Sequence, residues 1–293
     1  MPGRLEHIMA SMRDIKRRKG SIQSTQQITK AMKLVSTVKL QHARAEAEKS
    51  KDYFQCMYET VNNILSRVGD MEHRYLVKNN AVKKAVIVIT SNRGLAGGYN
   101  SNIVKLITRH DTWQKEEVQI FAIGNKGREM LARNDYEICE DLSEIVEAPT
   151  FADAMKLSNR LLEAYASGKI GEIHLAYTSF KNTVSHVPTL LQLLPIDRSG
   201  GGTEEGGDVL MNFEPTDEAA LDMIVPKYIT SLIYGALKES VASENGARMQ
   251  AMDNATGNAE EMINDLTLKY NRARQGSITQ ELTEIIAGAE AIS

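Results

Sequence analysis

The sequence predicts an α/β protein in which long N- and C-terminal helices pair as an antiparallel coiled coil, with a Rossmann-like α/β domain between them. Three observations predict this class. Apolar residues recur at helical spacing at both ends of the 293-residue chain, and short β-branched segments alternate with amphipathic segments in the middle. The ends also differ in charge: residues 1–45 hold ten Lys or Arg and two acidic residues, whereas residues 201–293 hold six and sixteen. We therefore expect the two ends to attract each other.

The N-terminal helix is predicted over residues 1–70. Its apolar positions form three stripes with spacings of three and four residues, which is the helical pattern. The stripes consist of Leu5, Ile8, Met9, Met12 and Ile15; of Ile28, Ala31, Met32, Val35 and Val38; and of Phe54, Met57, Val61, Ile64, Leu65 and Val68. The second stripe is rotated relative to the first, as expected if the helix bends or if its partner winds around it.

Residues 78–198 are predicted to form the α/β domain, because β-branched runs there alternate with segments of helical length. The predicted strands are Lys84–Thr90, Val118–Gly124, Glu137–Asp141, Ile173–Phe180 and Val187–Pro195, and the predicted helices lie near Ser101–His110, Lys126–Asn134 and Phe151–Ser167. Residues 199–215 follow as a flexible loop, since residues 199–207 contain five glycines.

The C-terminal helix is predicted over residues 216–293, with Thr216 or Asp217 as its N-cap and with Pro226 either starting a fresh helix or kinking this one. Its central part carries the heptad seam of a coiled coil. The seam residues are Ala242, Asn245, Met249, Met252, Thr256, Ala259, Ile263, Leu266, Tyr270 and Ala273. Beyond Gln275 the apolar spacing changes, and we expect an apolar tip that protrudes unpaired and requires another partner.

Several protein classes are disfavoured by composition and motifs. No run approaches the ~20 apolar residues of a membrane span, and the N-terminus lacks the apolar core of a signal peptide, so we expect a cytosolic protein. The two cysteines, Cys56 and Cys139, predict neither a disulfide framework nor a zinc site, and the six histidines lack ligand spacing. We expect no metal, no cofactor and no catalytic centre.

The glycine-rich segment Ser91–Asn100 is the strongest candidate for a ligand site. It follows a predicted buried strand and precedes a helix, which is where α/β folds bind phosphates. Its glycines fit neither the dinucleotide fingerprint nor the P-loop. An enzyme that binds a nucleotide at Gly94–Gly98 therefore remains an alternative to a structural turn or a protein contact loop, and residues 124–127 form a similar turn.

Two charged clusters allow more than one interpretation. The basic residues at positions 13–19 could contact nucleic acid, although they lack interleaved aromatic residues, and the sequence pI near 6.1 favours a solvated face or contact with acidic protein loops. A polar set near the other end either is simply solvated or forms specific links to acidic groups through arginine. That set comprises Arg272, Arg274, Gln275, Thr279, Glu281 and Glu284.

Four segments carry motifs that can be compared with known families. They read STQQITKAMKLV at residues 24–35, SNRGLAGGYN at residues 91–100, ARMQAMDNAT at residues 247–256 and YNRARQGSITQELTEIIAGA at residues 270–289. In order and spacing, over essentially the whole chain, they resemble the gamma subunit of F-type ATP synthases. The last segment is the most specific of the four.

The resemblance implies a central rotor shaft that is itself not catalytic. Its paired helices would stand inside a ring of three alpha and three beta subunits, and its other end would sit on the membrane rotor ring of c subunits, with the epsilon subunit as a further partner. The shaft would couple ion-driven rotation of the ring to ATP synthesis or hydrolysis in the beta subunits. Each beta subunit would meet a different face of the shaft, and these differing contacts would shift its nucleotide site between states.

The resemblance also implies which residues touch neighbouring subunits. Seven residues are implied to contact the beta subunits: Arg274, Gln275, Thr279, Arg248, Met32, Lys30 and Lys33. Arg248 and Met32 would face each other, and the two lysines would meet the acidic lever loops of beta, beside which the 91–100 segment also lies. Phe213 and Glu214 are implied to touch the membrane ring. The apolar tip would turn in a sleeve whose nondirectional contacts do not lock one angle.

Two departures from the family pattern fall in the middle motif, where many members have Asp in place of Asn92 and Cys in place of Ala96. Chemistry that needs that carboxylate or thiol is therefore not expected. The sequence shows neither a cysteine-bearing insertion of the chloroplast type nor a leading transit peptide. We expect a bacterial protein, peripheral on the cytoplasmic face of the plasma membrane.

Overall fold

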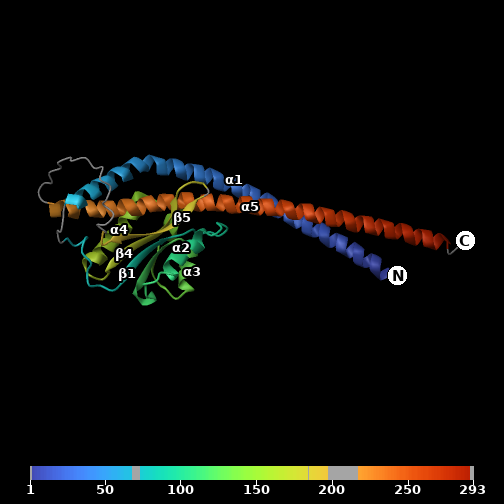
Figure 1. The fold of residues 1–293 in the computed structure, drawn as a ribbon, viewed down its shortest axis with the longest axis horizontal. Helices are drawn as coiled ribbons and strands as arrows, with labels where there is room; N and C mark the ends of the chain where they lie inside the picture. Colours follow the sequence, from blue (N-terminus) through green and yellow to red (C-terminus); the bar gives the residue numbers. More distant parts are fainter. Residues whose placement is uncertain (1, 68–72, 184, 197–216, 291–293) are drawn as a thin grey trace. The chain divides into compact units, whose positions relative to one another are not determined.

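The computed structural model describes residues 2–67, 73–183, 185–196 and 217–290 (Figure 1). Its long elements are the helices α1 (Pro2–Arg67) and α5 (Asp217–Glu290). Between them lie β1 (Lys84–Ile89), α2 (Tyr99–Thr108), η1 (Lys115–Glu117), β2 (Val118–Ile123), α3 (Asn125–Ala132), β3 (Glu137–Asp141), η2 (Ser143–Glu147), α4 (Phe151–Ala166), β4 (Glu172–Phe180) and β5 (His186–Leu194). The chain divides into two compact units, with boundaries after Val35 in α1 and after Arg248 in α5.

The five predicted strands and three predicted short helices are confirmed, with ends that differ by no more than two residues. The strands form one sheet in the order β3-β2-β1-β4-β5. β1 pairs in parallel with both β2 and β4, whereas β5 runs antiparallel to β4. The central strand β1 is a continuous apolar run because both of its faces are covered.

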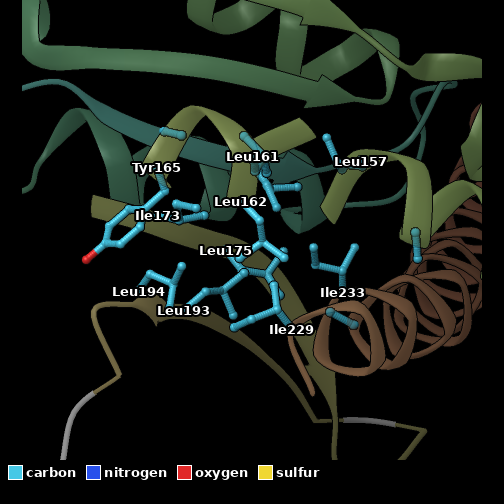
Figure 2. Packing of buried hydrophobic residues seen from close by; sticks show 14 of the residues in the cluster. Leu157, Leu161, Leu162, Tyr165, Ile173, Leu175, Leu193, Leu194, Ile229 and Ile233 are labelled. Carbon is cyan, nitrogen blue, oxygen red and sulfur yellow. The ribbon is translucent and has the colours of Figure 1, made fainter. Parts of the chain in front are cut away.

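Each face of the sheet has its own hydrophobic core. One core joins the sheet to α2 and α3, and the other joins it to α4 and to the first part of α5. Figure 2 shows the second core, where Leu157 and Leu161 of α4 and Ile229 and Ile233 of α5 pack with Leu175 of β4. Fully burying one such side chain stabilises the fold by about 1.5–3 kcal/mol. The apolar face of α5 therefore anchors this helix on the domain.

The start of α1 and the end of α5 pair in the other unit. Thr29 and Thr256 share a hydrogen bond of 2.8 Å, and Lys33 Nζ lies 2.6 Å from a carboxylate oxygen of Asp253. Because the higher number in α1 meets the lower number in α5, these contacts confirm the antiparallel arrangement. All ten predicted seam residues of α5 are buried or half-buried.

The helix α5 continues through Pro226, which excludes one of the two predicted alternatives, a fresh helix that starts at that residue. Thr230 donates a hydrogen bond of 2.8 Å to the Pro226 carbonyl. The predicted flexible loop at residues 199–215, which includes the predicted ring contacts Phe213 and Glu214, lies outside the described residues. The predicted division of the chain at residues 70, 78, 198 and 215 stays a prediction.

The single tryptophan, Trp113, lies between two histidines near the start of β4. Its ring is stacked on His110 with centroids 4.1 Å apart and contacts His174 at 4.7 Å. His174 is buried, and its Nε2 lies 3.0 Å from a carboxylate oxygen of Glu172. Burial lowers the pKa of His174, while the hydrogen bond to Glu172 acts in the opposite direction without cancelling it.

This lowered pKa makes the stability of the α/β domain depend on pH. As the pH falls below the ordinary histidine value near 6.5, the unfolded chain binds a proton that the folded chain does not, so stability is lost. The variant His174→Phe should show a shallower loss of unfolding free energy between about pH 7 and pH 5 than the wild type does. Urea titrations followed by Trp113 fluorescence measure both slopes. Equal slopes in the variant and the wild type would contradict this assignment. The variant should keep a residual slope, because burial also lowers the pKa of His186.

Candidate interaction surfaces

The two ends of the 91–100 segment are hydrogen-bonded to each other. Asn100 Oδ1 accepts hydrogen bonds from the Ser91 amide at 2.9 Å and from the Ser91 hydroxyl at 3.0 Å. Asn92 bridges to two further elements, because its Nδ2 donates to the Ser143 carbonyl at 2.9 Å and its Oδ1 accepts from the Asn125 amide at 3.0 Å. An aspartate at position 92 would lack the donor for Ser143. The amide at this departure from the family pattern thus has a structural role.

The first amides of α3 are all bonded within the chain. Asn92 Oδ1 accepts from Asn125, the Ser91 carbonyl accepts from Lys126 at 3.0 Å, and Thr90 Oγ1 accepts from Gly127 at 2.9 Å. A phosphate bound at the start of a helix accepts hydrogen bonds from the first backbone amides, which must then have no other acceptor. The predicted turn at residues 124–127 is therefore a structural turn.

Helix α5 crosses the carboxyl ends of β1 and β4, where the strand order reverses. The Tyr99 hydroxyl donates to the Ser240 carbonyl at 3.2 Å, and the Ser243 hydroxyl donates to the Thr178 carbonyl at 3.1 Å. The Phe180 amide donates to a Glu239 carboxylate oxygen at 3.1 Å. Open α/β sheets bind ligands at this switch point. Here side chains and carbonyls of α5 fill it, which weakens the nucleotide-binding alternative.

The polar residues predicted near the end of α5 are exposed. Arg274, Gln275 and Thr279 all face solvent in the described part of the chain. Every side chain that the structure describes beyond Gln280 is also exposed. The exposed apolar residues of this region are Ile278, Leu282, Ile285 and Ile286, with 48% to 68% of their surface accessible. The end of α5 thus combines hydrogen-bonding groups with an apolar tip.

The predicted contact residues of α1 have different environments. Lys30 is exposed and Met32 is half-buried, whereas Lys33 is already paired with Asp253. Such a partly exposed ion pair contributes at most about 1 kcal/mol. The sequence analysis did not foresee this partner, because the pair joins positions 220 residues apart. The exposed large apolar residues on the same helix, among those that the structure describes, are Ile28, Leu34, Val35 and Val38.

Arg248 has partners that the sequence analysis also missed. Its Nη2 lies 2.7 Å from a carboxylate oxygen of Glu244 and makes long hydrogen bonds to the carbonyls of Arg93 and Gly94. Two of the four motif segments, residues 91–100 and 247–256, thus meet in the structure.

The described residues hold no group of three or more His, Cys, Asp or Glu side chains placed to bind a metal ion. Within the same part of the chain, none of the helices combines the length and apolar character needed to cross a bilayer.

Comparison with known proteins decides the family. A family model described as ATP synthase matches residues 11–292. The ATP synthase gamma chain of Lachnoclostridium phytofermentans is 61% identical over 292 residues, which cover 97% of this chain and 100% of the relative. The chain belongs to the ATP synthase gamma chain family. The gamma chain of Alkaliphilus metalliredigens is 45% identical, covering 96% of this chain and 98% of that one.

Chains in solved structures of ATP synthases share the fold. The central stalk of the Tetrahymena thermophila mitochondrial ATP synthase matches with a TM-score of 0.58 and 26% identity over 78% of this chain and 99% of that chain. A chain of the Euglena gracilis mitochondrial enzyme matches with a TM-score of 0.68 and 20% identity over 97% of this chain and 95% of that chain. The predicted family and fold class are confirmed. As a gamma chain, the protein is the central stalk subunit of an F-type ATP synthase.

Proposed function

We propose that this gamma chain is the rotating shaft that couples ion-driven rotation of a membrane ring of c subunits to ATP synthesis or hydrolysis in the beta subunits. Three alpha and three beta subunits surround its paired helices, and the epsilon subunit is a further partner. The chain itself is not catalytic and uses no cofactor. It works as a peripheral protein on the cytoplasmic face of a bacterial plasma membrane.

The exposed end of α5 is the observation that carries this proposal. An apolar patch of this kind on a protein surface marks an interaction site. Apolar contact is nondirectional, so a sleeve around Ile285 and Ile286 holds the tip without fixing its angle. Such a bearing suits a helix that turns inside a ring of subunits.

The contacts of the shaft with the beta subunits are assigned to seven residues, three in the middle of α1 and four between the middle of α5 and its end: Met32, Lys30 and Lys33, and Arg248, Arg274, Gln275 and Thr279. Arginine forms paired hydrogen bonds to carboxylates, which are strong but breakable as the shaft turns. Each beta subunit meets a different part of this set, so contacts that differ between orientations shift its conformational equilibrium. Phe213 and Glu214 are assigned to the membrane ring.

A non-catalytic role is supported by the groups that fill the switch point of the sheet. Ser240 and Ser243 of α5 bond to Tyr99 and Thr178 there, and the first amides of α3 are bonded within the chain. A nucleotide would have to displace these contacts. The chemistry of ATP is therefore assigned to the beta subunits.

The proposal is tested by reconstitution into membrane vesicles. Complexes built with the full chain should pump ions when ATP is added, whereas complexes built without it should hydrolyse ATP without pumping. Affinity purification of the chain from bacterial membranes should also yield the alpha, beta, epsilon and c subunits. Ion pumping that does not need the chain would overturn the proposal.

The alternatives make distinct predictions for the purified chain alone. A nucleotide-dependent α/β enzyme would bind or hydrolyse ATP without its neighbours. A nucleic-acid-binding coiled coil would bind DNA or RNA through residues 13–19 with strong salt dependence. We expect neither activity from the isolated chain.

A further inference from the structure

Two opposite charges lie largely buried where α5 meets the loop after β1. Glu244 and Arg248 are four residues apart on α5, and their side chains are only 14% and 12% exposed. Their charged atoms are 2.7 Å apart, and the acidic residue precedes the basic one, which is the favourable order on a helix. Burying a charge is costly unless it is paired. Glu244 therefore determines where the Arg248 guanidinium lies.

The oriented guanidinium holds the loop formed by residues 93–98. Arg248 Nη2 donates to the Arg93 carbonyl at 3.4 Å and to the Gly94 carbonyl at 3.5 Å. Both hydrogen bonds are long, so they depend on an arginine that is already aimed at the loop. These contacts join residues more than 150 positions apart in the sequence. The loop is thereby tied to α5.

The other end of the loop is held by Tyr99, the first residue of α2. Its buried hydroxyl donates to the Ser240 carbonyl on α5 at 3.2 Å. Burial raises the pKa of Tyr99, and the nearby carboxylate of Glu244 raises it further. The phenol therefore stays neutral beside the ion pair. Tyr99, Glu244 and Arg248 form one cluster that holds both ends of the 93–98 loop against α5.

The tip of this loop is in an unfavourable conformation. Leu95 has a φ of 63°, in the left-handed region that leucine rarely adopts, and 64% of its surface is exposed. Such strained residues persist only where the surrounding structure holds them, and they gather at functional sites. An exposed leucine held at a strained loop tip is suited to contact a partner.

We propose that Glu244 is a positioning residue. By orienting Arg248 it holds the 93–98 loop against α5, and it thereby presents Leu95 to a neighbouring subunit at a fixed angle. We call these contacts of Glu244 and Arg248 with the loop the clasp. This inference rests on the proposed function as a rotating shaft. The clasp makes the loop and the helix turn together. The neighbour is the beta subunit beside which the resemblance places the 91–100 segment, and the exposed Leu95 meets an apolar part of its surface during rotation.

The variant Glu244→Gln tests the clasp in the full chain assembled with its partner subunits. Two quantities are measured: the hydrogen exchange rate of the amides of residues 93–98, and the number of ions pumped per ATP hydrolysed. We expect loop exchange to accelerate by roughly tenfold and pumping per ATP to fall to about half. The matched control is Asp265→Asn, which breaks another pair four residues apart on α5, Asp265 with Lys269, whose side chains are 57% and 60% exposed. We expect the control to change neither quantity.

A charge swap separates positioning from simple stabilisation. The double variant Glu244→Arg with Arg248→Glu retains an ion pair on the helix, but residue 248 can no longer donate to the loop carbonyls. We expect its melting temperature to stay closer to that of the wild type than that of Glu244→Gln does, while its loop exchange remains fast and its pumping remains low. Recovery of both loop exchange and pumping in the swap would overturn the proposal.

The remaining outcomes also separate the clasp from the proposed function. Unchanged loop exchange in Glu244→Gln would overturn the clasp and leave the shaft function standing. Faster exchange with full pumping would show that the loop need not be fixed, which also overturns the inference. Failure of the wild-type chain to support any ATP-driven pumping would instead overturn the proposed function.

Discussion

Replacing Gly124 with alanine is expected to destabilise the α/β domain by about 3 kcal/mol. Gly124 has a φ of 117°, a conformation that side-chain-bearing residues avoid. A Cβ added there would lie 2.2 Å from the Thr90 carbonyl oxygen, which belongs to the backbone and cannot rotate away. The same turn supplies the carbonyl that accepts the Thr90 hydroxyl at 3.1 Å. The substitution therefore combines backbone strain with a steric clash.

Urea unfolding followed by Trp113 fluorescence measures this loss, because the single tryptophan lies in the α/β domain. The control is Gly257→Ala, at an exposed position inside α5 where an added Cβ meets no atom within 4 Å. Alanine is the better helix former, so the control should gain about 0.5–1 kcal/mol of helix stability without affecting the tryptophan signal. A loss below about 1 kcal/mol for Gly124→Ala would show that the turn can relax.

Local patterns in the sequence were sufficient to predict most elements of the fold. The apolar run of β1 and the heptad seam of α5 are properties of short segments, so their spacing predicts them without further information. The strand order and the antiparallel direction of β5 are not local properties, and the sequence analysis did not predict them. The sequence analysis left two alternatives at Pro226, and it could not choose between them because the packing of α5 on the sheet, which overrides the local preference of proline, is not a local property.

In the interaction surfaces, too, the sequence analysis predicted local properties and missed contacts between distant segments. Exposure of Arg274 and its neighbours follows from their position outside the seam, whereas the partners of Lys33 and Arg248 depend on how distant segments align. No spacing rule links Lys33 to Asp253 or Arg248 to the 93–98 loop. The one available signal was the Glu244 to Arg248 spacing of four residues, which marks a helical ion pair but not its burial.

The double variant Arg274→Glu with Gln275→Ala is expected to slow ATP-driven rotation by about tenfold or more while the complex still assembles. Both residues are exposed on α5 in the described chain, so the substitutions should change its stability by no more than about 0.5 kcal/mol. A hydrogen bond to a charged group contributes about 1.5–3 kcal/mol, and each 1.4 kcal/mol corresponds to a tenfold change in rate. Loss of the arginine contact, with repulsion from a carboxylate in its place, accounts for the expected effect.

A matched control is available two residues earlier on the same helix. Arg272→Glu makes the same change in charge at an exposed position, but position 272 points about 200° around the helix from position 274. If the contact depends on the face that carries Arg274, single-molecule rotation should be slowed by the double variant and nearly normal in this control. Equal slowing would mean that rotation responds to the net charge of the shaft. Normal rotation in both would remove Arg274 and Gln275 from the contact, and the apolar tip would then be the main link between the shaft and its neighbours.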